Sequence, residues 1–186
     1  MARARAKPLE ARRRAMLFGT VVDAATRSPL GGALVEVTSG PAGLPSLPAT
    51  SARADGHFHF LDLPAGRYAL RASLPGAGAR YGPVEAKVQV ARDTGRADGV
   101  ELALPPTLLT GSVTGPDAKP VAMARVNVQG SGESAFTDAQ GRFALAGLEP
   151  GRRTIQVTAR GLEPLSRQVT VAAGAEKSVD LKLTTG

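Results

Sequence analysis

The sequence predicts an all-β fold: two tandem, seven-stranded, antiparallel Greek-key β-sandwiches behind a short basic N-terminal tail. The first reason is an internal repeat, because the segment Asp55–Leu70 is echoed by Asp138–Ile155, with Gly, an aromatic residue, Leu, Pro and Gly in the same order. The second reason is composition, since 22 Gly and 14 Pro among 186 residues suit many short strands joined by tight turns. The third is that short apolar runs recur at regular spacing without a helical period.

The strands expected in the first sandwich follow from the alternation of inward apolar residues with outward polar ones. Ala33, Val35 and Val37 alternate in this way, and Phe58 and Phe60 do the same after an Asp-Gly turn. The expected strands are 17–23, 33–38, 57–61, 67–73, 84–90 and 99–104. Between them, the segments Ser39–Ala49 and Pro75–Pro83 are rich in Gly and Pro and are expected to be exposed loops.

Pro105 and Pro106 mark the boundary between the two copies, because prolines stiffen a connection and cannot donate ladder hydrogen bonds. The chain is therefore expected to divide into a tail at residues 1–16 and domains at 17–105 and 106–186. Equivalent positions of the two copies predict a shared set of core residues. These are Val35, Phe58 and Leu63 in the first copy, and Val126, Phe143 and Leu148 in the second.

A motif in the second copy carries a family resemblance. Pro-Val-x-x-Ala-x-Val-x-Val from Pro120 is followed from Thr137 by Thr-Asp-x-x-Gly-x-Phe-x-Leu-x-Gly-Leu-x-Pro-Gly. This pattern resembles the carboxypeptidase regulatory-like domain, and a looser version occupies the first copy. The resemblance covers nearly all of the chain after residue 16. It implies an immunoglobulin-like or prealbumin-like sandwich that serves as an accessory module, and it does not by itself assign a function.

The sequence predicts no catalytic, cofactor or metal site. The absence of cysteine excludes disulfides and thiolate chemistry. The two histidines, His57 and His59, share the solvent face of one expected strand, with Asp55 as the nearest further ligand. Such a set falls short of a zinc site, and no Gly-x-Ser-x-Gly motif suggests a nucleophile. We therefore predict a protein that is not an enzyme.

Most of the positive charge belongs to the tail. Its first 16 residues hold six basic residues against Glu10, which accounts for +5 of the net charge of +7. The tail is predicted to dock on a protein partner; an undocked disordered tail, nucleic acid bound through phosphates and an anionic membrane surface remain alternatives. The residues predicted to bind the partner are Arg3, Arg5, Lys7, Arg12, Arg13 and Arg14.

The N-terminal region lacks the apolar segment of a secretory signal peptide, and no stretch approaches the roughly 18 apolar residues of a membrane span. A cytoplasmic protein, or a component of a particle assembled in the cytoplasm, is expected. The predicted function is a non-enzymatic structural, adaptor or decoration role in a larger assembly. By analogy with the larger proteins and particles in which such domains occur, the expected assembly is a phage-tail-like contractile injection particle. The alternative is an adhesin-like or carbohydrate-binding module that uses the Ser39–Ala49 and Pro75–Pro83 loops.

Overall fold

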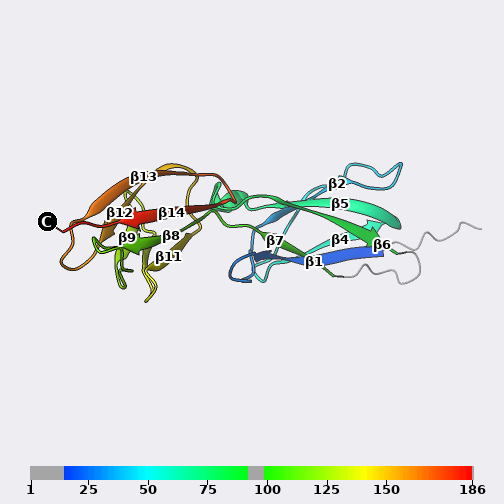
Figure 1. The fold of residues 1–186 in the computed structure, drawn as a ribbon. Helices are drawn as coiled ribbons and strands as arrows, with labels where there is room; N and C mark the ends of the chain where they lie inside the picture. Colours follow the sequence, from blue (N-terminus) through cyan, green and yellow to red (C-terminus); the bar gives the residue numbers. More distant parts are fainter. Residues whose placement is uncertain (1–14, 92–98, 186) are drawn as a thin grey trace, which may run out of the picture.

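The computed structural model describes residues 15–91 and 99–185, which form two β-sandwiches placed end to end (Figure 1). Each sandwich has seven strands, as predicted. The first contains β1 (Ala15–Asp23), β2 (Leu34–Ser39), β3 (Thr50–Ser51), β4 (His57–Leu63), β5 (Gly66–Ser73), β6 (Val84–Val90) and β7 (Val100–Leu104). The second contains β8 (Leu108–Thr114), β9 (Arg125–Val128), β10 (Ser134–Phe136), β11 (Arg142–Ala146), β12 (Gly151–Thr158), β13 (Leu165–Val171) and β14 (Glu176–Lys182).

The two sandwiches share one topology. In the first, a sheet of order β4-β1-β7 faces a sheet of order β3-β2-β5-β6; in the second, the orders are β11-β8-β14 and β10-β9-β12-β13. The chain crosses from one sheet to the other four times in each copy, as in Greek-key sandwiches. The predicted fold class is therefore confirmed.

One detail of the prediction needs correction, because not every strand pair is antiparallel. β1 pairs with β7 in parallel, and β8 pairs with β14 in the same way. In each copy, the last strand arrives after a crossing from the opposite sheet and runs in the direction of the first strand. A crossover connection of this kind is what parallel pairing requires.

The strands expected from the sequence are present in the structure, and their ends differ from the expected ones by a few residues. β1 begins at Ala15, where the sequence predicted Leu17, and Ala15 pairs with Leu63 of β4. Ala15 and Met16, assigned to the tail from the sequence, therefore belong to a strand. The short strands β3 and β10 were not predicted. A short 3-10 turn, Pro75–Ala77, lies in the second expected loop.

The six predicted core residues are all buried, which confirms the proposed register. Phe58 is 2% exposed and Phe143 is 5% exposed, and the other four are at most 1% exposed. Each sandwich has its own apolar cluster. One is built on residues of β1, β2, β4, β5, β6 and β7, and the other on residues of β8, β9, β11, β12, β13 and β14.

Candidate functional site

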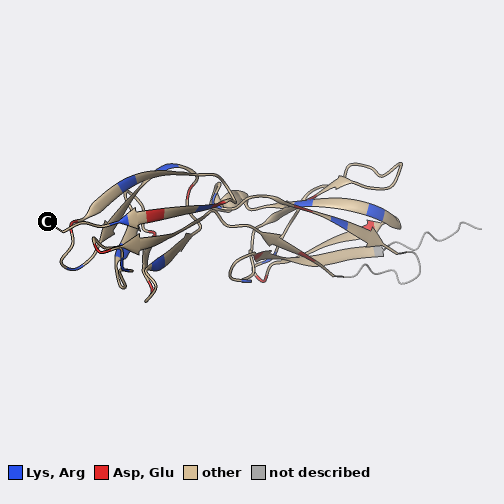
Figure 2. Ribbon diagram, in the orientation of Figure 1, with Lys and Arg blue, Asp and Glu red and all other residues tan. Residues whose placement is uncertain are grey.

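The predicted anchor in the N-terminal tail cannot be placed. Its six basic residues lie outside the described residues: Arg3, Arg5, Lys7, Arg12, Arg13 and Arg14. Over the described strands, basic and acidic residues are scattered across both sandwiches (Figure 2). The partner-binding role of the tail therefore stays a prediction.

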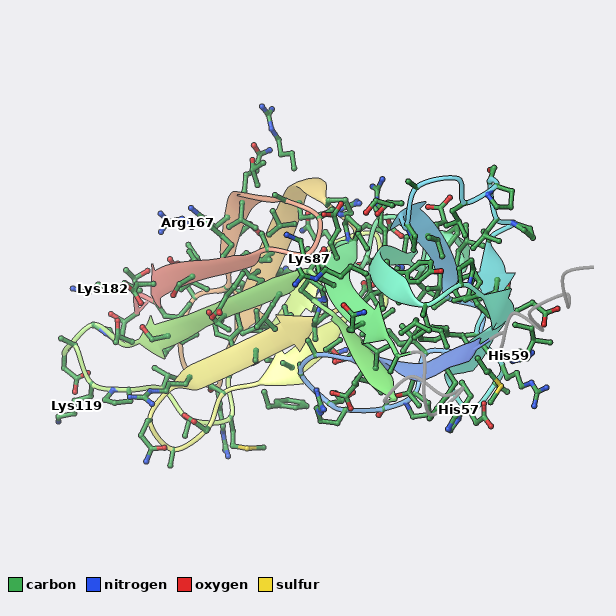
Figure 3. All side chains as sticks on the ribbon, turned by 90° about the vertical axis from the view of Figure 1, so that its right-hand side faces the viewer. His57, His59, Lys87, Lys119, Arg167 and Lys182 are labelled. Carbon is green, nitrogen blue, oxygen red and sulfur yellow. The ribbon has the colours of Figure 1, made fainter. Side chains whose placement is uncertain are left out.

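The two histidines lie on the outer face of β4, where both are exposed, as predicted (Figure 3). His57 Nδ1 is 3.3 Å from Asp55 Oδ1. The backbone N–H of His57 donates to the same carboxylate, and this hydrogen bond is the main reason that the pKa of Asp55 is lowered. Across residues 15–91 and 99–185, no three His, Asp or Glu side chains gather as a metal site would require.

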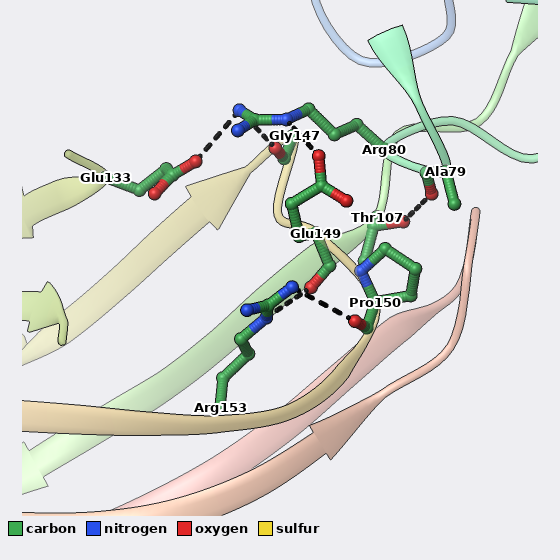
Figure 4. Close-up of polar contacts among 8 residues, drawn as sticks. All are labelled: Ala79, Arg80, Thr107, Glu133, Gly147, Glu149, Pro150 and Arg153. Atoms are coloured by element: carbon green, nitrogen blue, oxygen red, sulfur yellow. Dashed lines mark hydrogen bonds and ion pairs between the residues drawn. The ribbon is translucent and has the colours of Figure 1, made fainter. Parts of the chain in front are cut away.

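The two loops proposed for ligand binding are both engaged within the protein. Leu44 and Leu47 of the Ser39–Ala49 loop pack against the first core. The Pro75–Pro83 loop reaches the second sandwich, where it forms the junction between the two domains (Figure 4). The junction is therefore the candidate functional site.

Arg80 extends from the first sandwich into the second and meets two carboxylates there. Its Nε donates to Glu149 Oε1 at 2.9 Å, and its Nη1 donates to Glu133 Oε1 at 2.9 Å and to the Gly147 carbonyl at 3.2 Å (Figure 4). The side chain of Glu133 is only 16% exposed, so this pair is less screened by water than a surface pair. The guanidinium thus spans two loops of its neighbour.

The charges of this cluster support one another. The hydrogen bond with Glu149 is the main cause that raises the pKa of Arg80. The pKa of Glu133 is lowered, first by a hydrogen bond from Ser131 and also by the charge of Arg80. Arg153 holds the Glu149 loop from within the second sandwich, because it donates to the carbonyls of Glu149 and Pro150 at 2.9 and 3.2 Å.

Thr107 ties the connecting segment to both domains. Its N–H donates to the Arg80 carbonyl at 2.8 Å, and its carbonyl accepts from Leu148 N at 3.2 Å. Its buried hydroxyl accepts from Gly174 N at 2.8 Å and lies 3.4 Å from the Ala79 carbonyl, to which it donates. Every polar group of this residue is therefore used in holding the two sandwiches together.

The backbones of the two sandwiches touch at a pair of glycines. A Cβ built on Gly174 would lie 2.4 Å from Gly82 Cα, closer than any real contact allows. Gly174 also has φ of +65°, which favours glycine. Gly82 N donates to the Pro105 carbonyl at 2.9 Å, so the contact also fixes the connecting prolines.

Tyr81 fastens the junction loop to its own sandwich. Its hydroxyl donates to Asp23 Oδ2 at 2.7 Å, at the end of β1. Burial, followed by this hydrogen bond, raises the pKa of Tyr81 to about 12. Burial acts to raise the pKa of Asp23, but hydrogen bonds from the Thr26 backbone and Tyr81 outweigh it, and the pKa of Asp23 is lowered.

The sequence predicted a stiff boundary at Pro105 and Pro106 but not the side chains that bridge it. Two signals were available. The second copy has Glu149 where the first has Pro64, and the first copy has a longer loop around Arg80 than its counterpart. Neither signal identifies a contact without knowledge of which loops meet.

Comparison with known families identifies both sandwiches. The family of the carboxypeptidase regulatory-like domain matches residues 16–102 and 109–184. The chain therefore belongs to this family, as its motifs suggested, and carries two copies of the domain. A search of curated proteins found no match.

Several solved structures are similar. A type II cohesin–X-dockerin complex from Acetivibrio cellulolyticus matches with 22% identity and a TM-score of 0.35, over 43% of this chain and 58% of that chain. The TIE protein of Bacillus anthracis matches with 16% identity and a TM-score of 0.48, over 92% of this chain and 34% of that one. A shaft pilin of Lactobacillus rhamnosus GG matches with 12% identity and a TM-score of 0.41, over 93% of this chain and 97% of the pilin. The chain thus spans about three fifths of the first of these proteins and a third of the second.

No helix within the described ranges has the length and apolar character needed to cross a membrane.

Proposed function

We propose that this protein is a non-enzymatic structural or adaptor module in which two sandwiches form a stiff spacer of fixed orientation. The observation that carries the proposal is the set of contacts across the junction. The ion pairs of Arg80 and the hydrogen bonds of Thr107 bridge the two domains, and so does the backbone contact between Gly82 and Gly174. Domains that are meant to move independently are joined by few contacts and a flexible linker. Here the connecting segment is itself part of the interface.

Membership of the carboxypeptidase regulatory-like family supports a module without its own catalysis, because the domain resembles a regulatory and not a catalytic part of its namesake enzymes. A spacer must be attached to other molecules at its ends. We propose that the basic tail provides one attachment by binding an acidic surface of a protein partner. Nucleic acid is the weaker alternative for the tail. The narrower prediction of a contractile injection particle rests on analogy alone and has no support from the fold or the matches. The cytoplasmic location also stays a prediction.

The anchor is tested by comparing the full chain with a form that starts at Ala15, since β1 begins there. Both are purified from the native host under mild conditions, and the stoichiometry of co-purifying protein is measured. We expect the shortened form to stay folded and to lose its partner. Replacement of Arg12, Arg13 and Arg14 by Gln should weaken capture most at low salt. If the shortened form retains its partner at unchanged stoichiometry, the tail is not the anchor.

A further inference from the structure

The outer face of the sheet β10-β9-β12-β13 carries an unusual row of uncharged polar side chains. Ser134, Asn127, Gln156 and Ser166 are paired directly across the four strands in that order. They face outward because their neighbours Val126, Val128, Ile155 and Val157 are buried. We call this row the amide row.

The first sandwich supplies an internal reference for this face. By register, Glu36, Arg71 and Glu85 are paired across β2, β5 and β6 at the positions of Asn127, Gln156 and Ser166. In the first copy the row therefore alternates in charge, as is common on a solvated sheet surface. The second copy keeps the buried positions apolar but has replaced these charges by amides and a hydroxyl.

The side chains of the amide row have unused hydrogen-bonding groups. None of the four forms a side-chain hydrogen bond with another described residue. The paired amides of Asn127 and Gln156 together offer several hydrogen-bond donors and acceptors. Their outward-facing donors and acceptors are therefore available to a ligand.

The same face carries positive charge and one exposed aromatic ring. Arg125 is paired with Thr158 and with Phe136, and Arg152 is paired with Thr170 toward the opposite end of the strands. The outward residues of β9, β10, β12 and β13, all described, include no acid. Phe136 is 58% exposed, although large apolar side chains are usually covered.

A strained residue, Met123, is hydrogen-bonded to the residue that follows Phe136. Met123 is 71% exposed and has φ of +55°, a conformation that costs energy for a residue with a side chain. The equivalent residue of the first copy is Gly32, with φ of +78°. Met123 N donates to the Thr137 carbonyl, next to Phe136. The second copy thus exposes an apolar side chain on β10 and another in the turn before β9, the latter against a backbone preference.

We propose that this face binds an acidic polysaccharide. The amide row supplies paired donors and acceptors for sugar hydroxyls, Phe136 supplies a surface on which an apolar ring face rests, and Arg125 and Arg152 supply cations for carboxylates. Charge complementarity selects an acidic chain over a neutral one, because the only charged outward residues of the four strands are arginines. The site is on the second sandwich and does not depend on the tail.

The test is calorimetric titration of the full chain with a galacturonic acid hexamer, with a maltohexaose and a single-stranded DNA of matched charge as comparison ligands. We expect binding of the acidic hexamer, weakened about tenfold by Asn127→Ala combined with Gln156→Ala, because each lost hydrogen bond contributes modestly. This double variant removes no charge, so attraction to the basic tail is the same in both proteins. Arg125→Gln with Arg152→Gln should also weaken binding and reduce its dependence on salt.

The matched control is Arg71→Ala in the first sandwich, which lies at the position of Gln156 and should leave binding unchanged. Thermal unfolding verifies that each variant is folded. The proposal is overturned if the acidic hexamer does not bind, if Asn127→Ala with Gln156→Ala binds as tightly as the parent, or if maltohexaose or DNA binds through the same residues with equal affinity.

Discussion

The ring of Phe143 lies against Gly111, its direct partner on the neighbouring strand β8. A Cβ added to Gly111 would approach the ring to 2.8 Å. The first sandwich repeats this relationship with Phe58 and Gly19, where the corresponding distance is 2.7 Å. In both copies a glycine makes room for an aromatic ring that its partner strand turns into the core.

Phe143→Ala should destabilise the second sandwich by about 3–5 kcal/mol, because the substitution leaves a cavity that the adjoining glycine cannot fill. Urea unfolding followed by circular dichroism measures the change. Phe136→Ala is the matched control, since this phenylalanine is 58% exposed and its loss should change stability by no more than about 0.5 kcal/mol. Equal effects of the two substitutions would mean that the ring of Phe143 is not part of the core.

The phenol of Tyr81 should lose its proton only at high pH, because burial and its hydrogen bond to Asp23 raise its pKa to about 12. Since this pKa is higher in the folded than in the unfolded chain, the stability that the phenol contributes is complete below pH 10 and is lost as the pH rises toward 12. The difference in unfolding free energy between the parent and Tyr81→Phe, about 1 kcal/mol near neutral pH, should shrink over this range. A difference that stays constant to pH 12 would contradict the hydrogen bond.

The histidine pair should not bind zinc tightly. Two exposed imidazoles and Asp55 do not complete a tetrahedral site, so calorimetry with Zn²⁺ should give a dissociation constant weaker than about 10 micromolar. A submicromolar signal that disappears in His57→Ala would show that ligands beyond these residues complete a site.

Gly174→Ala should weaken the junction. The substitution combines an unfavourable φ with a collision against Gly82, and we expect a loss of about 1–3 kcal/mol. Gly161→Ala is the matched control, because Gly161 has φ of +76° but no neighbour within 4 Å of an added Cβ. A larger loss for Gly174→Ala than for Gly161→Ala in urea unfolding isolates the contact between the domains, and equal losses would mean that the contact contributes nothing.

The interior of each sandwich could be predicted because it repeats. Alternation at Val35 and Val126 sets one face of a strand, and the shared Gly-x-Phe pattern aligns Phe58 with Phe143. The parallel pairing of β1 with β7 could not be read in this way, since it joins strands some 80 residues apart and depends on how the chain crosses between sheets. β3 and β10 are too short to show a pattern.

The junction was only half predictable. Two consecutive prolines, Pro105 and Pro106, predict a stiff connection from the sequence alone. The role of Arg80 cannot be predicted in this way, because it depends on the fold placing Glu133 and Glu149 opposite its side chain. Likewise, the amide row could not be predicted from the sequence, because it depends on the strand register that places Asn127 beside Gln156. Long-range pairing, which local patterns do not encode, decides both.

If the junction fixes the two sandwiches relative to each other, the distance between a point on one and a point on the other has a single value. The chain has no cysteine, so Lys87→Cys on β6 and Lys182→Cys on β14 allow two spin labels to be placed on exposed positions of separate sandwiches (Figure 3). Double electron–electron resonance should give one narrow distance distribution, which broadens when Arg80→Ala and Gly174→Ala are combined. A parent protein whose distribution is already as broad as that of the combined variant would contradict a stiff spacer.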